Sequence, residues 1–512
     1  MNLTKTFLLA LIYLNSFLSL AQKVLIGKDK PNIILILTDD QRFNTISALG
    51  NDEIETPNLD KLVKSGTTFT QAHIMGGAHP AVCMPSRAML MTGKNQFSLE
   101  SYGANIPANH ITIGEHLQKQ GYFTAHVGKW HNDRQSHHRS FNTAKKIFGM
   151  SYLPWKTTNA HWHTPVYDFK ADGNYDPSEF YHDPPLEDFT APYEHTKSKG
   201  RHSSEVFTDG AIEFISERQA VDKKDKKPFF LYLAHVAPHD PRQYPAELAQ
   251  RFTKEKVSLP ENFMTIHPFD NGEMKIRDEL LLRSPRFEAD VKQEIADYYA
   301  IIFHLDKQIG RLFNYLESTG LDRNTIIILA GDNGLALGQH GLVGKQNVYE
   351  HSVRVPLIIS GPGIPMNEKR DQFSYIHDIF PTVCEIIGTD IPETVESKSL
   401  LSIIQESKTV RKDLYFAYRD VQRSIKDEKF KLIEYVVPNK NMYLPPERKG
   451  EFITTTQLFD LSNDPLEMKN LAKDPRYREK LLEMRQKLRE ASRKLNDNND
   501  QGMTFWNNYN PK

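Results

Sequence analysis

Three apolar runs constrain the fold of this 512-residue chain more than any other feature. They cover 33–37, 229–234 and 326–330, and each is apolar at every position rather than at every second one. Continuous runs rich in β-branched and aromatic residues are typical of strands buried on both faces of a parallel sheet. We therefore predict an α/β fold built on such a sheet.

Acidic and amide side chains directly follow two of these runs. Asp39 and Asp40 come after the first run, and Asp332 and Asn333 come after the third. Open α/β sheets bind their ligands at the carboxyl ends of their parallel strands. Neighbouring carboxylates repel one another unless a cation is present, and oxygen ligands suit a hard cation. The sequence therefore predicts a metal site, although each pair alone also fits a polar cap or an ordinary turn.

Titratable and basic side chains hold similar positions after other strands. His235 and His239 follow the second run, while Lys129 and His131 follow a strand predicted at 122–127. A single lysine or histidine is usually solvated or satisfied in the core. These residues therefore indicate a function only if they belong to one site.

Cys83, Pro85, Ser86 and Arg87 place four chemically distinct groups within five residues. Glycine and proline break regular structure just before Cys83, and a helical pattern resumes after it. Backbone N–H groups at such a loop-to-helix junction favour an anion. The simpler alternative is a buried thiol. The only other cysteine, Cys384, lies in an apolar helical pattern, and a bridge between the two stays open.

The N-terminal segment is typical of a secretory signal peptide. Residues 1–21 contain an early lysine, an apolar run and a small-x-small cleavage site. A retained membrane anchor is the alternative, but polar residues interrupt the run. We expect an exported protein, periplasmic or secreted, without stable membrane insertion. The formal net charge of -1 provides no global field for nucleic acid or anionic membranes.

The remainder divides into two predicted parts. Residues 22–402 hold all three apolar runs and form the predicted catalytic α/β domain. Within it, 132–204 reads as a long insertion that could shape a substrate pocket. Residues 403–512 are more polar, with short strand patterns and a charged helix, and predict a smaller α+β subdomain. Its tail is interpreted as disordered or as a closing flap.

Two motifs in this order resemble the formylglycine-dependent (type I) sulfatase family of the alkaline-phosphatase-like superfamily. The first is Cys83-x-Pro85-Ser86-Arg87 followed by Thr92-Gly93, and the second runs from Gly121-Tyr122-x-Thr124 to Gly128-Lys129-x-His131. Residues 457–467 look like the family's C-terminal subdomain. The resemblance implies a large, mixed, mostly parallel sheet sandwiched by helices, with a smaller C-terminal α+β subdomain.

The resemblance also implies a modified nucleophile and a cation. Cys83 would be oxidised during export to formylglycine by a formylglycine-generating enzyme or an anaerobic sulfatase-maturating enzyme. One divalent cation, Ca²⁺, would be held by modified Cys83 and by Asp39, Asp40, Asp332 and Asn333. The hydrate of the formylglycine aldehyde would attack the sulfate ester.

The remaining roles follow from the same resemblance. Arg87 would hold the formylglycine hydroxyl, and Lys129 and Lys345 would neutralise sulfate oxygens. His131 would orient the hydrate and later help to expel sulfate, and His239 would protonate the leaving alcohol. The competing acid is His235, and the predicted substrate-binding residues are Lys129, Lys345, His235 and Arg242.

The function expected from these residues is hydrolysis of sulfate esters on a sulfated polysaccharide or oligosaccharide. Arg242, close to the predicted acid, favours a carbohydrate substrate. Two alternatives stay open: a phosphate or phosphonate ester hydrolase of the same superfamily, and a non-catalytic glycan-binding protein with unmodified Cys83. The sequence does not specify the sugar or the sulfated position.

Overall fold

The structure is a computed structural model that describes residues 30–149, 161–162, 164–170, 172–173, 181–182, 201–439 and 451–511. The predicted signal peptide and much of the predicted insertion lie outside these residues. Among the helices of the described part, we find none with the length and apolar character that crossing a membrane requires.

The central sheet has eight strands, and the three apolar runs are its adjacent middle strands β10, β1 and β9. These strands are parallel to one another and to β5 and β6, whereas β11 is antiparallel to both β10 and β2. The predicted mixed, mostly parallel sheet is therefore confirmed. In spatial order the strands are β12 (Glu368–Arg370), β2 (Gly66–Phe69), β11 (Leu357–Ser360), β10 (Thr325–Gly331), β1 (Asn32–Thr38), β9 (Phe229–Ala234), β5 (Phe123–Lys129) and β6 (Thr143–Phe148).

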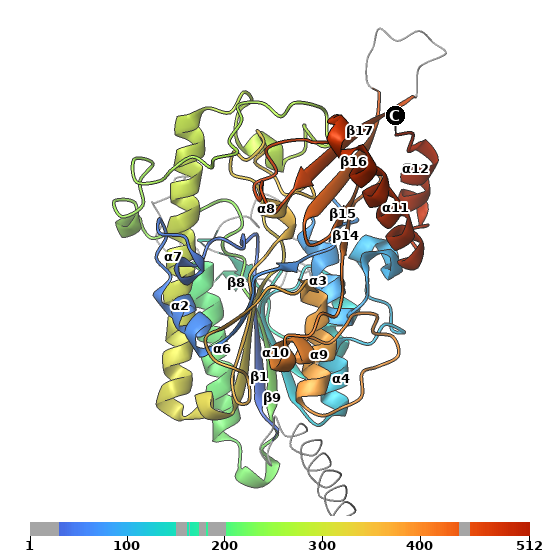
Figure 1. The fold of residues 1–512 in the computed structure, drawn as a ribbon. Helices are drawn as coiled ribbons and strands as arrows, with labels where there is room; N and C mark the ends of the chain where they lie inside the picture. The colour runs from blue at the N-terminus through green and yellow to red at the C-terminus, as the bar shows by residue number, and fades with distance from the viewer. Residues whose placement is uncertain are drawn as a thin grey trace, which may run out of the picture.

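Helices cover both faces of this sheet (Figure 1). Successive side chains of β1 point to opposite faces, so Ile34 and Ile36 pack with one helical layer while Leu35 and Leu37 pack with the other. The first layer contains α2 (Pro57–Ser65), α6 (Ser203–Ala220) and α7 (Glu288–Thr319). The second contains α3 (Cys83–Thr92), α4 (Ile113–Lys119), α9 (Ile379–Ile386) and α10 (Leu401–Glu406).

Shorter elements connect these layers. The helices are α5 (Arg134–Ser140) and α8 (Glu350–Val353), and the two-residue strands are β3 (Ala72–His73), β4 (Gly76–Gly77), β7 (Pro165–Val166), β8 (Tyr181–His182) and β13 (Ser374–Tyr375). The 3₁₀ turns are η1 (Ser47–Leu49), η2 (Gln96–Ser98), η3 (Glu100–Gly103), η4 (Lys223–Asp225), η5 (Ala246–Leu248), η6 (Asp278–Leu281), η7 (Leu321–Asn324), η8 (Ile376–Asp378) and η10 (Pro475–Tyr477).

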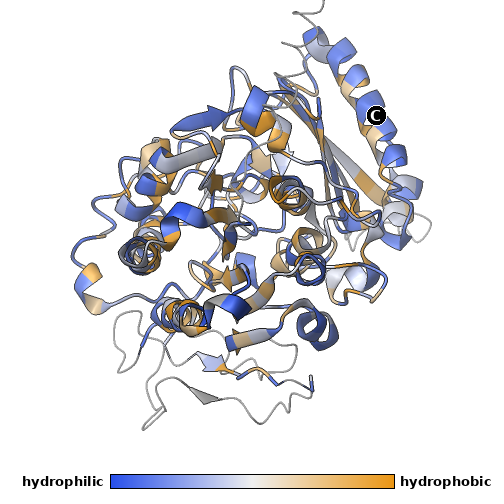
Figure 2. Cartoon of the chain, turned by 90° about the horizontal axis from the view of Figure 1, so that it is seen from below, coloured by the Kyte–Doolittle hydropathy of each residue, from blue (hydrophilic) through white to orange (hydrophobic). Residues whose placement is uncertain are grey.

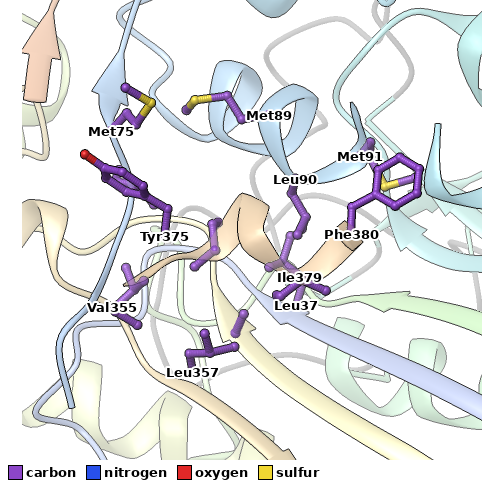
Figure 3. Packing of buried hydrophobic residues seen from close by; sticks show 14 of the residues in the cluster. Leu37, Met75, Met89, Leu90, Met91, Val355, Leu357, Tyr375, Ile379 and Phe380 are labelled. Atoms are coloured by element: carbon purple, nitrogen blue, oxygen red, sulfur yellow. The ribbon is translucent and has the colours of Figure 1, made fainter. Parts of the chain in front are cut away.

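The helix that begins at Cys83 is anchored in the hydrophobic core (Figure 3). Leu90 and Met91 of α3 lie close to Ile379 and Phe380 of α9, and Leu37 of β1 lies beneath them. All five side chains are fully buried. This packing fixes α3, and with it Cys83, against the carboxyl end of β1.

A second sheet joins the C-terminal residues to the segment that precedes Cys83. Its order is β17 (Phe452–Asp460), β16 (Phe430–Pro438), β15 (Gln422–Lys426), β14 (Leu414–Tyr418) and β4. Gly76 of β4 pairs with Ala417 and has a φ of 102°, and a Cβ there would lie 2.2 Å from the Ala417 carbonyl oxygen. Only glycine fits this close approach. The domain boundary after residue 402 stays a prediction.

Helices α11 (Arg478–Lys494) and α12 (Asp500–Asn508) complete the C-terminal region. Met484 and Leu488 of α11 pack against the second sheet, and Figure 2 shows both hydrophilic and hydrophobic colours along the outer helices, as expected when one side is buried. The tail was expected to be disordered or a flap. It instead forms α12, because Phe505 and Tyr509 bury themselves against Val436.

One buried carboxylate ties the tail to the second sheet, and its removal should be costly. Asp497 accepts hydrogen bonds from Arg423 (Nε to Oδ2, 2.6 Å), Tyr415 (2.6 Å) and Trp506 (3.0 Å). We expect Asp497→Ala to lower the free energy of unfolding by about 3–5 kcal/mol, because it leaves the buried Arg423 charge unpaired. Urea denaturation measures this. The exposed Glu490→Ala is the control, and equal midpoints for the two variants would contradict the prediction.

Candidate active site

The register of the central sheet brings the predicted site residues to one edge. Thr38 lies beside Gly331, and Leu37 and Gly128 both lie beside Ala234. The four strands β10, β1, β9 and β5 therefore end at the same level, and the segments that follow them meet. Cys83 approaches this edge from α3, which is held by the packing described above.

The acidic residues form two overlapping clusters. Asp39, Cys83 and Asp332 offer ligand atoms within 4.8 Å of one another, as do Asp39, Asp40 and His239. Asp40 has a φ of 64°, and its backbone N–H donates to Asp332 Oδ1 at 3.1 Å. Its Oδ1 accepts a hydrogen bond of 2.6 Å from Asn333 Nδ2, although Asn333 is distant from Asp40 in the sequence.

Oxygen atoms in this cluster are suited to a cation. Asp39 Oδ1 and Asn333 Oδ1 are buried and have no hydrogen-bond partner among the described residues. Burial, together with the negative charge of Asp39, raises the pKa of Asp332 to about 6. A divalent cation would satisfy the two oxygens and relieve this repulsion, and an all-oxygen set is what Ca²⁺ prefers. The residues present therefore fit the predicted metal.

Cys83 lies at the centre of three basic or titratable side chains. Its Sγ is 3.3 Å from His131 Nδ1, 3.8 Å from Lys129 Nζ and 4.0 Å from Lys345 Nζ. Burial raises the pKa of the Cys83 thiol to about 11, although the two lysines oppose this rise. An unmodified Cys83 is therefore protonated at neutral pH, unlike the thiolates that act as cysteine nucleophiles.

Arg87 lies one helical turn beyond Cys83, and its guanidinium contacts both Asp39 and Asp332. Its Nε donates to Asp332 Oδ2 at 2.9 Å, and its Nη2 donates to Asp39 Oδ2 at 3.3 Å. Its Nη1 donates to the backbone carbonyl of Lys129 at 2.8 Å. The side chain is fully buried, so this guanidinium balances carboxylates from two strand ends while it fixes the end of a third strand.

Two lysines from distant segments extend toward the sulfur. Lys129 forms an ion pair with Asp39, and Lys345 Nζ lies 2.6 Å from Asp40 Oδ1. Burial opposes their charge, but Asp39 and Asp40 raise the pKa of Lys129 and Lys345 respectively. Both lysines are therefore cationic. Desolvation and the charge of Lys129 lower the pKa of His131 well below its usual value, so its ring is neutral.

The structure separates the two histidines that compete for the role of acid. His239 Nδ1 donates to the Asp240 carbonyl oxygen at 2.7 Å, and its Nε2 lies 3.7 Å from Asp40 Oδ2. His235 has no exposed surface, and its ring lies 6.2 Å from that of Phe207. Burial lowers the pKa of His235 to about 3. Of the two, His239 lies in the acidic cluster.

The side chain of Arg242 contacts two residues of α7. It is buried, lies 3.4 Å from Glu294 and stacks over the Tyr298 ring at 5.5 Å. Substrate contact by Arg242 or His235 stays a prediction.

Sequence reasoning missed Tyr298, which supports the loop that carries Asp39 and Asp40. Its hydroxyl donates to the Asp40 carbonyl at 2.6 Å and accepts from the Arg42 N–H at 3.0 Å. It therefore holds the backbone on both sides of Gln41. Tyr298 lies within the regular amphipathic pattern of α7, where an aromatic residue indicates only a core position, so no sequence signal identified it.

The family profile described as sulfatase matches residues 31–389, which is more than half of the chain. This chain belongs to the sulfatase family. Sulfatases are hydrolases of sulfuric esters, so this chain is a sulfuric ester hydrolase. The profile described as N-sulphoglucosamine sulphohydrolase, C-terminal, matches residues 338–494.

Individual relatives agree with this family. The sulfatase is 29% identical to an arylsulfatase of Clostridium perfringens over 88% of this chain and 92% of the relative. It is 28% identical to an N-acetylglucosamine-6-O-sulfatase of Bacteroides thetaiotaomicron over 92% and 87% respectively.

Solved structures share the fold. One, in complex with its substrate D-glucosamine-2-N,6-O-disulfate, has a TM-score of 0.71 and 23% identity over 92% of this chain and 99% of that one. A phosphonate monoester hydrolase of Agrobacterium radiobacter has a TM-score of 0.70 and 21% identity over 91% and 96%. The predicted fold class is thereby confirmed.

Proposed function

We propose that this sulfatase is exported and hydrolyses sulfate esters of a sulfated carbohydrate, using formylglycine at position 83 and a bound Ca²⁺. The observation that carries the proposal is the arrangement of Lys129, Lys345, His131 and His239 around Cys83 and the acidic cluster. Two relatives support the substrate class by their names: the N-acetylglucosamine-6-O-sulfatase and an ulvan-active sulfatase of Formosa agariphila, 29% identical over 73% of this chain and 65% of the relative.

Asp39, Asp40, Asp332 and Asn333 would hold the cation, together with the modified side chain at position 83. Bound there, Ca²⁺ supplies positive charge for a sulfate oxygen and favours a deprotonated hydroxyl. Three carboxylates already face three cationic side chains in this site. The added charge would therefore leave the pocket with excess positive potential, which suits a sulfate monoester anion.

Position 83 is the site of the nucleophile. Formylglycine, once formed there, supplies a hydrated aldehyde whose hydroxyl can attack sulfur. His131, neutral and 3.3 Å from the sulfur atom of Cys83, is suited to orient such a hydroxyl and to accept its proton. Arg87 keeps the surrounding carboxylates in place. The modification requires a formylglycine-generating or anaerobic sulfatase-maturating enzyme in the producing cell.

The two lysines would bind the sulfate group itself. Lys129 at the end of β5 and Lys345 in the segment after β10 both approach the Cys83 sulfur, and these two strands lie on opposite sides of β1. Their ammonium groups can neutralise non-bridging oxygens as negative charge develops during transfer. Both lysines now contact carboxylates, so we infer that cation binding redirects them toward the substrate.

His239 would protonate the leaving alcohol as the S–O bond breaks, and this role predicts a dependence on the leaving group. We expect His239→Ala to lower turnover of phenyl sulfate, a poor leaving group, by about 10²–10⁴-fold, and that of 4-nitrophenyl sulfate far less. A nitrophenolate departs without a proton, which is the reason for the difference. Steady-state rates across a series of substituted phenyl sulfates measure it, and equal losses would remove the acid role.

A desulfation screen tests the substrate class. The natively exported protein is incubated with defined sulfated oligosaccharides and with phosphate and phosphonate esters, and released anions are measured. We expect turnover of at least one carbohydrate sulfate to exceed that of every phosphorus ester. Faster phosphonate hydrolysis would favour the alternative hydrolase, and binding without turnover would favour a glycan-binding protein. Recovery of the protein outside the cytoplasm, without residues 1–21, tests export.

A further inference from the structure

One short turn connects the predicted acid with the loop that carries Lys345. Arg277 directly precedes η6, and Asp278 and Glu279 are its first two residues. We propose that these three residues are positioning residues, with Arg277 orienting His239 through Asp240 and with Asp278 and Glu279 fixing the 343–346 segment. This inference rests on the proposed role of His239 as the general acid.

The contacts on the His239 side form a continuous chain. His239 Nδ1 lies 3.3 Å from Asp240 Oδ1, in addition to its bond to the Asp240 carbonyl. Arg277 Nη1 donates to the same Oδ1 at 3.2 Å, and Arg277 Nη2 donates to Asp240 Oδ2. This two-pronged geometry fixes the plane of the carboxylate, which in turn fixes the imidazole with Nε2 facing Asp40.

Burial makes this arrangement dependent on Arg277. Only 9% of the Asp240 side chain is exposed, so its carboxylate has little access to water. Despite burial, the charges of His239 and Arg277 lower the pKa of Asp240, and Arg242 contributes in the same direction. Without Arg277, the Asp240 carboxylate would keep its charge but lose the two hydrogen bonds that orient it.

The contacts on the Lys345 side are equally direct. Arg277 Nη1 also donates to Asp278 Oδ1 at 2.8 Å, and Asp278 Oδ2 accepts from Gln346 Nε2 at 2.6 Å. Gln346 Nε2 further donates to the Pro80 carbonyl at 3.0 Å, and its Oε1 accepts from the backbone N–H of Lys345 at 3.0 Å. The side chain of Gln346 thus joins the turn to Lys345 and to the loop that enters Cys83.

Glu279 completes the attachment. Its Oε1 accepts from the N–H of Gly344 at 2.9 Å and its Oε2 from the N–H of Val343 at 3.0 Å. Arg286 pairs with the same carboxylate. Glu279 therefore holds the backbone of the 343–346 segment directly, and Asp278 holds it through the side chain of Gln346. An error of about 1 Å in such a group can cost about 10²-fold in rate, which gives the turn a catalytic consequence without substrate contact.

The test uses the full, natively exported enzyme and the substituted phenyl sulfates. We expect Arg277→Ala to lower kcat on phenyl sulfate about 10- to 100-fold and on 4-nitrophenyl sulfate less than about 3-fold, because misplacing the acid harms only substrates that need a proton. In a His239→Ala background, Arg277→Ala should cause no further loss on either ester. Arg277→Lys, which keeps the charge without the two-pronged geometry, should fall between wild type and Arg277→Ala.

Asp278→Ala provides the second arm. Because it releases Gln346 and the Lys345 segment, we expect it to lower kcat and kcat/KM for every ester by a similar factor, without selectivity for the leaving group. Arg283→Ala is the matched control. Arg283 lies six residues after Arg277, its side chain is 63% exposed, and it pairs with Asp290. This variant should leave kcat and KM unchanged, and thermal melting verifies that each variant folds.

The outcomes separate this inference from the proposed function. If His239→Ala is selective for poor leaving groups but Arg277→Ala lowers both esters equally, or adds fully to His239→Ala, the positioning role of Arg277 is overturned while the acid role stands. If His239→Ala is itself unselective, the acid role fails and this inference fails with it. If Arg277→Ala does not fold, Arg277→Lys is tested in its place. A loss of turnover confined to esters with poor leaving groups then supports the positioning role of Arg277. An equal loss on all esters overturns it.

Discussion

Cys83→Ala is expected to abolish sulfate release while the protein stays folded. The replacement removes the position at which the nucleophile forms, and loss of an activated nucleophile lowers turnover by about 10⁴-fold or more. The helix that begins at this residue is held by Leu90 and Met91 in the core, so the fold does not depend on the thiol. We expect a stability cost of about 1 kcal/mol for one small buried group. Turnover of 4-nitrophenyl sulfate and thermal melting measure both quantities.

The chain provides a matched control for this variant. Cys384 is the second cysteine, is also a buried free thiol and lies in the hydrophobic core that contains Leu90 and Met91. Cys384→Ala should carry a similar stability cost and leave turnover unchanged. Intact-mass measurement of the wild-type protein reports whether Cys83 is converted to the aldehyde. Near-normal turnover by Cys83→Ala would contradict the proposed nucleophile.

Removal of the cation is expected to have the second largest effect. Treatment with a calcium chelator should reduce turnover by at least about 10²-fold, since the site loses charge that stabilises developing negative charge on oxygen. Re-addition of Ca²⁺ should restore it. Calcium should also raise the melting temperature, because a ligand at about 100 times its Kd stabilises the folded state by about 2.7 kcal/mol. Melting curves with and without Ca²⁺ provide this second readout.

Asp39→Asn tests which residues bind the ion. This variant removes one buried carboxylate charge from the cluster, so both the turnover and the calcium-dependent rise in melting temperature should be largely lost. The exposed Asp371→Asn makes the same chemical change elsewhere and should keep both. A full calcium response in Asp39→Asn would place the ion outside this cluster.

The strands and their terminal residues were predictable because their signals are local. A buried parallel strand must be apolar at every position, so 33–37, 229–234 and 326–330 were identified by composition alone. Parallel strands end at one edge, so the meeting of Asp39 and Asp332 followed from the fold class. Cys83 and Lys129 were identified by motifs that carried the family resemblance.

Other features depended on packing between distant segments. The tail forms α12 because Phe505 is buried against Val436 of β16. The composition of the tail alone did not indicate this helix. Tyr298 contacts the Asp40 backbone across 258 residues, and Arg277 reaches Asp240 across 37. No residue near Tyr298 or Arg277 in the sequence signals such a contact.

The sequence by itself determined the sheet, the family and the side chains that follow its strands, because periodicity and motif spacing are properties of neighbouring residues. Only the tertiary structure decided which of two histidines, four residues apart, lies beside Asp40. His239 lies beyond the turn that follows β9, with Nε2 facing Asp40 and with Asp240 and Arg277 behind it, whereas His235 is buried near Phe207. The sequence positions of His235 and His239 are both compatible with a general acid. The path of the chain after β9 places only His239 beside Asp40.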